Sequence, residues 1–234
     1  MKLLVTRPLE DSGALAAKLE SLGHEPVIVP LLAIKARDAV VIPDLPFQAL
    51  CVSSANGLLA QADLAAYKHL PFFAIGPQSA LEARRHGFDH VHDKGGNVEG
   101  LVRTIVKQAK PENGPILYLS GSETTGDLEG KLKTQGFVVS RVIAYDAQPC
   151  RVEGLAQFCE GADGVMLYSP RSAKLWAQQV SLANLTVDVA ELQHFCLSAN
   201  VAAALPQSWR KILSAAPDEN AMLQLLDLHD QALD

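Results

Sequence analysis

Small polar residues follow most of the short apolar runs in this 234-residue sequence, and they are its most frequent chemical signal. If the runs are parallel strands, these residues lie at the carboxyl ends, where open α/β sheets bind ligands. Hydroxyl groups and the unpaired N–H groups of a following helix suit an anion. The alternative is that each residue only caps its own helix. The candidates are Thr6, Arg7, Ser53, Ser54, Asn56, Gly76, Ser79, Ser120, Gly121, Ser169, Ser172, Ser198 and Asn200.

A second chemical group is the phenol of Tyr145, which lies in the segment 141–149. Val142 and Ile143 favour an extended strand, and Pro149 ends the strand because it has no N–H group to donate. A tyrosine in such a strand is either a buried core residue with a hydrogen-bonded hydroxyl or an acid that faces a cleft. The local sequence leaves both interpretations open.

Motifs for metals and common cofactors are missing or incomplete. Residues 121–127 have the spacing of a phosphate-binding loop, but Asp127 stands where its lysine belongs. There is no G-x-G-x-x-G fingerprint and no motif of a catalytic serine or cysteine. His86, His90 and His92 are close in sequence, but the last two flank an expected strand, so we expect no metal site. We therefore predict that the protein needs neither a metal nor an organic cofactor.

Composition excludes several classes of partner. The formal net charge is -6 and the pI is about 5.6, and without a clustered basic face we expect no nucleic-acid partner. No apolar run approaches the length of a membrane span, and residues 1–5 lack an apolar leader, so we expect no membrane association. Four scattered cysteines indicate buried thiols in a reducing compartment. We expect a cytoplasmic protein, and because nothing demands a dimer, a monomer.

Short apolar runs alternate with helical patterns along the whole chain. This alternation is typical of βαβ units and a parallel sheet. The expected strands lie at residues 3–5, 27–29, 49–52, 72–75, 116–119, 138–143, 165–167 and 195–197.

An internal repeat sets the expected domain organisation. Gly13, Leu15, Lys18, Leu19 and Gly23 recur 113 positions later as Gly126, Leu128, Lys131, Leu132 and Gly136. If the chain leaves each copy of the repeat at the same point, the two segments that connect the domains run side by side. The first domain is then discontinuous in sequence. A simpler alternative is two consecutive domains divided near residue 115. We expect a first domain of residues 1–34 and 150–234, a second of residues 38–143, and linkers at 34–38 and 143–150.

Six segments, in order along the chain, carry a resemblance to a known family. They are Leu4–Pro8, the helix end from Leu19 to Gly23, Ser53–Gly57, Ala74–Ala80, Leu117–Gly121 and Val142–Tyr145. In that order and at those distances they resemble uroporphyrinogen-III synthase over most of the chain. The resemblance implies an α/β fold of two flavodoxin-like, parallel-sheet domains, the first discontinuous, joined by a two-segment extended linker.

The resemblance also implies an activity and a role for Tyr145. The enzyme would close the linear tetrapyrrole hydroxymethylbilane into uroporphyrinogen III, inverting the last pyrrole ring, in haem biosynthesis and without a cofactor. Its small-molecule substrate carries many carboxylates, which the polar turns would bind. Tyr145 matches the tyrosine that helps the substrate hydroxyl leave, and a phenol with a pKa near 10 is a weak acid. The sequence departs from the family at Val201, where a threonine is usual, so Ser198, Asn200 or backbone N–H groups would replace that contact.

Two other functions use the same sequence features. A non-enzymatic, two-domain cytoplasmic binding or sensor module would hold a polycarboxylate ligand in the same turns and close by hinge motion. A structural α/β adaptor would bind its partner through the acidic surface. Turnover of hydroxymethylbilane separates the enzyme from both alternatives.

Overall fold

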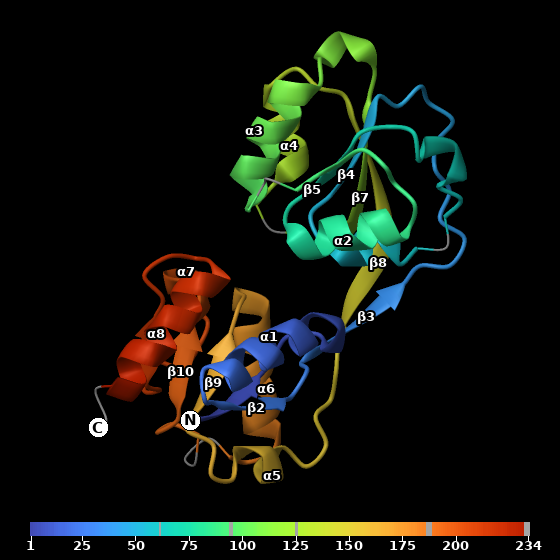
Figure 1. Cartoon of the computed structure of the whole chain (residues 1–234). Coiled ribbons are helices and arrows are strands. Elements are labelled where there is room, and N and C mark those ends of the chain that lie inside the picture. The colour runs from blue at the N-terminus through green and yellow to red at the C-terminus, as the bar shows by residue number, and fades with distance from the viewer. Residues whose placement is uncertain (61, 94–95, 125, 186–188, 232–234) are drawn as a thin grey trace. The chain divides into compact units, whose positions relative to one another are not determined.

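The chain forms two compact α/β units in the computed structural model, which describes residues 1–60, 62–93, 96–124, 126–185 and 189–231 (Figure 1). Unit 1 comprises Met1–Ala33 and Gln148–Asp234, and unit 2 comprises Ile34–Ala147. Two strands pass the chain between them, β3 (Leu32–Ala36) and β8 (Val139–Pro149).

Unit 1 is built on a five-stranded parallel sheet with the order β11-β10-β9-β1-β2. The central strands are mostly apolar, as expected where helices cover both faces. Leu3, Leu4 and Val5 of β1, for example, are 0% exposed. The strands are β1 (Lys2–Val5), β2 (Glu25–Ile28), β9 (Gly164–Leu167), β10 (Gln193–Cys196) and β11 (Lys211–Leu213), and the helices are α1 (Leu9–Ser21), α5 (Leu155–Cys159), α6 (Pro170–Leu182), α7 (Ala199–Ala203) and α8 (Glu219–Gln231).

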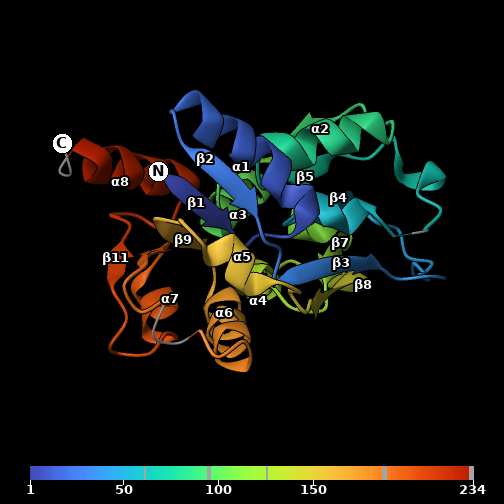
Figure 2. The same cartoon turned by 90° about the horizontal axis from the view of Figure 1, so that it is seen from below.

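Alternate residues of the unit 1 strands form two cores, one on each face of the sheet. Leu3 and Val5 pack with α1 and α8, whereas Leu4 packs with α5, α6 and α7. Figure 2 shows the strands of unit 1 between these two groups of helices.

Unit 2 is built on a six-stranded sheet with the order β3-β8-β7-β4-β5-β6. Helix α2 covers one face, while α3 and α4 pack together on the other (Figure 1). The remaining strands are β4 (Ala49–Val52), β5 (Phe72–Ala74), β6 (Val91–His92) and β7 (Ile116–Gly121). The helices are α2 (Pro77–Arg85), α3 (Val98–Gln108) and α4 (Leu128–Thr134), with short 3₁₀ turns at Ala55–Leu58, Ala65–Tyr67 and Pro111–Asn113.

Equivalent strands have the same spatial order in the two sheets, but the first strand along the chain occupies a different position in each sheet. The 113-residue repeat matches β1 with β7 and β2 with β8, and the later sequence echoes match β9 with β4 and β10 with β5. With these matches, β11-β10-β9-β1-β2 corresponds to β6-β5-β4-β7-β8. In unit 1 this is the flavodoxin-like order 2-1-3-4-5, and in unit 2 it is a circular permutation of that order. The predicted pair of parallel-sheet α/β domains is confirmed.

The two connecting strands lie next to each other in the sheet of unit 2. Near one end the N–H of Cys150 donates to the carbonyl of Leu31 (3.0 Å), and near the other the N–H of Arg37 donates to the carbonyl of Ala144 (2.9 Å). The partner's number falls as the chain advances, so the two strands are antiparallel. Within unit 2, Arg37 also donates two hydrogen bonds to Asp146 (2.7 and 3.0 Å), and this contact holds the pKa of the carboxyl at about 2.

A buried histidine in unit 1 makes its stability depend on pH. His194 is 0% exposed, its Nδ1–H donates to the carbonyl of Arg210 (2.9 Å), and its ring stacks on Trp209 with centroids 4.8 Å apart. Its Nε2 atom has no hydrogen-bond partner in the described part of the chain. Burial is the largest cause that lowers the pKa of this imidazole to about 4.

We expect unit 1 to lose stability as the pH falls from about 6.5 towards 4. In that window the unfolded chain binds the His194 proton and the folded chain does not, so protonation favours unfolding. Above pH 6.5 the imidazole is neutral in both states. A pKa of about 4 instead of 6.5 corresponds to a loss of about 3 kcal/mol.

Urea unfolding followed by tryptophan fluorescence at pH 7.5 and pH 4.5 measures this loss, because both tryptophans, Trp176 and Trp209, belong to unit 1. His194→Phe removes the titrating group and should flatten the pH dependence. An equally steep loss of stability in that variant would contradict the assignment to His194.

Candidate functional site

The predicted polar turns gather at one edge of each sheet. In unit 1 the neighbouring strands β1, β9 and β10 are parallel, so the residues that follow them lie along a common edge. In unit 2 the same holds for β7, β4 and β5. In unit 1, β2 is added on one side of β1 and β9 on the other, so the strand order reverses between β1 and β9. In unit 2 the order reverses in the same way between β4 and β7. Such switch points are where doubly wound sheets bind ligands.

The first turn of unit 1 uses its hydroxyl group for folding. The Thr6 side chain is 1% exposed and donates to the carbonyl of Met166 in β9 (2.7 Å). This bond ties the end of β1 to the neighbouring strand. The Thr6 hydroxyl is thus engaged within the fold, and the charged group of this turn is the side chain of Arg7.

Ser169 and Ser172 form a capping box at the start of α6. The Ser169 hydroxyl accepts a hydrogen bond from the Ser172 N–H (3.0 Å), and the Ser172 hydroxyl lies 3.1 Å from the Ser169 nitrogen. Proline at the first helical position supports the same helix start. Both hydroxyls are therefore engaged in local contacts in this structure.

The turn after β10 differs from the other two. Ser198 caps the short helix α7 without a side-chain cap bond, and Asn200 is exposed. Val201 is 1% exposed and packs in the core on the α6 side of the sheet. The apolar residue at position 201 thus contributes to packing, and polar contacts in this turn are left to Ser198, Asn200 and the backbone.

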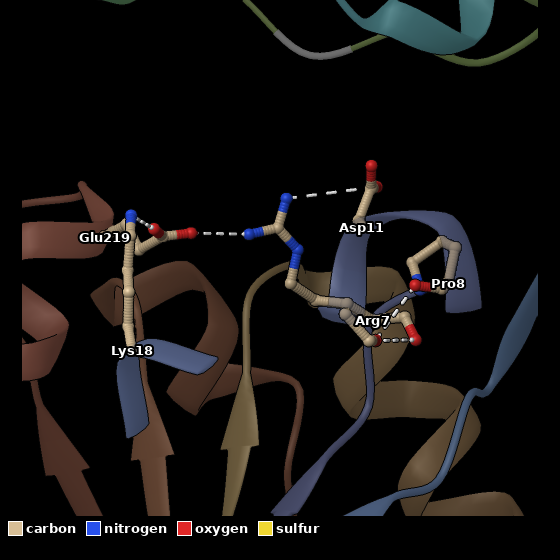
Figure 3. A network of polar contacts seen from close by, with 6 residues as sticks. Arg7, Pro8, Asp11, Lys18 and Glu219 are labelled. Atoms are coloured by element: carbon tan, nitrogen blue, oxygen red, sulfur yellow. Dashed lines mark hydrogen bonds and ion pairs between the residues drawn. The ribbon is translucent and has the colours of Figure 1, made fainter. Parts of the chain in front are cut away.

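Arg7 lies at the switch point of unit 1, where it meets both an aromatic ring and two carboxylates. Its guanidinium carbon is 5.1 Å from the ring centroid of Tyr168. Its Nη1 donates to Glu219 of α8 (2.8 Å) and its Nη2 is 3.9 Å from Asp11 of α1 (Figure 3). Burial raises the pKa of the Asp11 carboxyl, while the charge of Arg7 opposes that rise.

In unit 2 the turn after β4 begins with two serines. The Ser53 hydroxyl lies 2.7 Å from the hydroxyl of Tyr118 in β7, and Ser54 accepts from the N–H of Asn56 (3.3 Å) at the start of a 3₁₀ turn. The Asn56 side chain is buried, with 5% exposure. Burial raises the pKa of Tyr118 to about 12.

The turn after β5 opens helix α2. Gly76 is the extended residue before this helix, and a Cβ atom built at Gly76 has no heavy atom within 4 Å. Ser79 lies in the first turn of α2 and is 5% exposed. The turn thus has open space at Gly76, directly before a helix whose first N–H groups have no partner within the helix.

Arg141, which is not among the residues predicted from the sequence, binds the end of β7. Arg141 of β8 donates to the Ser120 hydroxyl (2.8 Å) and to the carbonyls of Gly121 (2.8 Å) and Ser122 (3.0 Å). Its planar group matches this set of acceptors. The available signal in the sequence was a charged residue directly before the β-branched pair Val142 and Ile143 of an expected strand.

Tyr145 lies directly beside that turn. It is paired with Gly121 in the register of β7 and β8, at an irregularity of the ladder. A Cβ atom on Gly121 would lie 2.8 and 2.9 Å from carbon atoms of the Tyr145 ring. The ring is half-buried and packs at the margin of the core on the α2 side of the sheet. The Tyr145 ring therefore lies against Gly121 at the carboxyl end of β7, the strand that borders the switch point of unit 2.

Other features of the described residues add no competing site. No group of three or more His, Cys, Asp or Glu side chains is placed to hold a metal, and no helix is long and apolar enough to cross a bilayer. His92 stacks on Phe73 with centroids 4.9 Å apart, and His86 lies 3.4 Å from Glu82. A cavity of about 410 Å³ between β6 and α3 contains none of the predicted site residues.

Comparisons with known proteins agree on one family. The family model described as uroporphyrinogen-III synthase HemD matches residues 13–224. The chain is similar in structure to uroporphyrinogen-III synthetase from Helicobacter pylori 26695, with a TM-score of 0.63, 16% identity, and coverage of 97% of this chain and 100% of that one. It is also similar to a mutant uroporphyrinogen III synthase from the extremely thermophilic bacterium Thermus thermophilus, with a TM-score of 0.50, 15% identity, and coverage of 100% and 98%. A sequence comparison with curated proteins gives no significant match.

Proposed function

The chain belongs to the uroporphyrinogen-III synthase family, and on that premise we propose that its polar turns bind hydroxymethylbilane while Tyr145 assists the departure of the substrate hydroxyl. The reaction closes the linear tetrapyrrole into uroporphyrinogen III with inversion of the last pyrrole ring. The protein is thus a lyase of porphyrin and haem biosynthesis.

The binding part of the proposal rests on the turns at the carboxyl edges of the two sheets. Helices α2 and α6 begin at these edges, and their first N–H groups favour carboxylates. Arg7 adds a guanidinium at the switch point of unit 1. We propose that the substrate carboxylates bind at Thr6, Arg7, Ser53, Ser54, Asn56, Gly76, Ser79, Ser120, Gly121, Ser169, Ser172, Ser198 and Asn200, with the backbone acting where a hydroxyl is already engaged.

The catalytic part of the proposal concerns one proton transfer. The phenol of Tyr145 donates its proton to the leaving hydroxyl, the C–O bond breaks with its electron pair on oxygen, and water departs. The remaining carbocation is stabilised by its pyrrole and then needs correct positioning for ring closure. No electron is gained or lost in these steps.

The surroundings of the other tyrosines support Tyr145 as the acid. Tyr118 holds the Ser53 hydroxyl at 2.7 Å, and burial raises its pKa to about 12. Burial also raises the pKa of Tyr168, which lies beneath Arg7. A higher pKa makes a phenol a poorer acid at neutral pH. Tyr67 packs edge-on against Phe47 with ring centroids 5.8 Å apart.

The decisive experiment is an isomer assay with the purified protein. Freshly prepared hydroxymethylbilane is incubated with the chain, without added metal or cofactor, and the cyclic products are oxidised and separated. We expect isomer III in excess over the uninverted isomer I. Isomer I alone, formed at the rate of the buffer reaction, would reject the catalytic proposal and favour the binding module.

We further propose that the active protein is a cytoplasmic monomer. The proposed residues of both units come from one chain, so no second copy is needed to complete the set. Among the described residues no disulfide joins Cys51, Cys150, Cys159 and Cys196, which suits a reducing compartment. Light scattering at assay concentration tests the oligomeric state, and a dimeric mass would contradict the monomer.

A further inference from the structure

The Arg7 guanidinium is already occupied by a carboxylate of the same chain. Glu219, the first residue of α8, places its Oε2 2.8 Å from Arg7 Nη1 and its Oε1 2.6 Å from Lys18 Nζ. One carboxylate thus bridges two cations, each through its own oxygen. Figure 3 shows Glu219 between the two side chains, with Asp11 on the other side of Arg7.

The Glu219 contact resembles the contact that a substrate carboxylate would make. Arg7 lies at the switch point of the unit 1 sheet, and its charge is the one a carboxylate ligand would seek there. In this structure Glu219 satisfies that charge. A carboxylate that binds Arg7 must therefore compete with Glu219.

Asp11 is the weaker of the two internal competitors. Its carboxylate oxygen is 3.9 Å from Arg7 Nη2, beyond hydrogen-bond distance, whereas Glu219 is at 2.8 Å. Burial also raises the pKa of Asp11 and so disfavours its charged form. Glu219, by contrast, stands at a helix N-terminus, where a negative charge is favoured.

Breaking the ion pair between Glu219 and Arg7 requires little free energy. The side chains of Arg7 and Glu219 are 27% and 31% exposed, and ion pairs of such exposure are weak. After release, Glu219 keeps its contact with Lys18, whose side chain is 52% exposed. The carboxylate therefore stays paired while Arg7 becomes available.

We propose that Glu219 is a specificity-determining residue that occupies Arg7 in the free enzyme and yields it to a carboxylate of the substrate. This inference rests on the proposed function of the turns and adds a residue to it. A neutral group at this position cannot replace the charge of Glu219, so the contact favours the acidic side chains of the tetrapyrrole.

A double-mutant cycle on full-length protein tests the inference. The probe is uroporphyrin III, the stable oxidised form of the product, whose fluorescence reports binding without catalysis. We expect Glu219→Gln to lower its Kd by about 2- to 5-fold, because a weak competing ion pair is removed. In the Arg7→Gln background the same change should give no gain, because there is no guanidinium left to release.

Glu129→Gln is the matched control. Glu129 is 29% exposed and its Oε1 lies 2.6 Å from Lys133, so it has the exposure and pairing of Glu219 away from Arg7. The Kd of Glu129→Gln for uroporphyrin III should equal that of the wild type. Tryptophan fluorescence confirms that each variant of unit 1 is folded, because Trp176 and Trp209 are both core residues.

Two results would overturn the inference while leaving the enzyme assignment intact. One is an unchanged or higher Kd for folded Glu219→Gln, which is the result expected of a purely structural ion pair. The other is a gain of equal size in the Arg7→Gln background. A wild-type chain that makes no uroporphyrinogen III removes the proposed function, and the inference falls with it.

Discussion

Tyr145→Phe is expected to lower the turnover of hydroxymethylbilane by about 10- to 1000-fold, because it removes only the proton that assists the departing hydroxyl. The ring, which packs against Gly121, is kept. Stability should therefore change little. The measurement is single-turnover kinetics at saturating substrate, with urea unfolding of the same samples.

The product isomer gives a second readout of the same variant. Closure without the enzyme keeps the last ring in its original orientation, so the share of isomer I should rise as the enzyme slows. Tyr67→Phe is the control, because it also loses one phenol hydroxyl but lies against Phe47. Full activity of a normally folded Tyr145→Phe would leave backbone amides or a bound water as the source of the proton.

Gly121→Ala is expected to lower turnover by about 100-fold through the position of the Tyr145 ring. The added Cβ would lie 2.8 and 2.9 Å from ring carbons and 3.1 Å from the Glu123 carbonyl oxygen. Gly121 belongs to a buried central strand, so the ring has to move. A shift of about 1 Å in a catalytic group can cost a factor of this size.

The effect of Gly121→Ala should depend on the phenol hydroxyl. In a Tyr145→Phe background the alanine should add little further loss, because both changes remove the same proton transfer. Gly13→Ala is the control, since a Cβ at Gly13 in α1 has no heavy atom within 4 Å. Equal losses of turnover in both backgrounds would show that Gly121 acts on something other than Tyr145.

The sequence predicted the fold well because its signals were local or repeated. Residues 3–5 form an apolar run, and central parallel strands covered on both faces need such runs. The 113-residue repeat linked two βα units far apart in the chain, and the sheet orders match when those units are superposed. The family resemblance read from six short segments is confirmed by the match over residues 13–224.

The site was less predictable because its contacts depend on tertiary structure. Arg7 and Glu219 are 212 positions apart, and no spacing rule pairs them. The same holds for Ser53 and Tyr118, whose hydroxyl groups meet only because β4 and β7 are neighbours. Thr6 illustrates a second reason. The sequence pattern of a hydroxyl residue after a strand is the same whether the hydroxyl binds a ligand or, as in this protein, donates to the carbonyl of Met166.

The order of the strands along the chain has a consequence during synthesis on the ribosome. All six strands of the unit 2 sheet have been made once residue 149 is complete. Strand β1, in contrast, pairs with β9, which begins at Gly164. At typical elongation rates of about 5–20 residues per second, β1, which ends at Val5, waits roughly 8 to 32 s for that partner. Leu3, Leu4 and Val5 lack the neighbouring strand β9 throughout this interval, and between the synthesis of residue 149 and that of Gly164 the middle section of the chain already has every strand of its sheet.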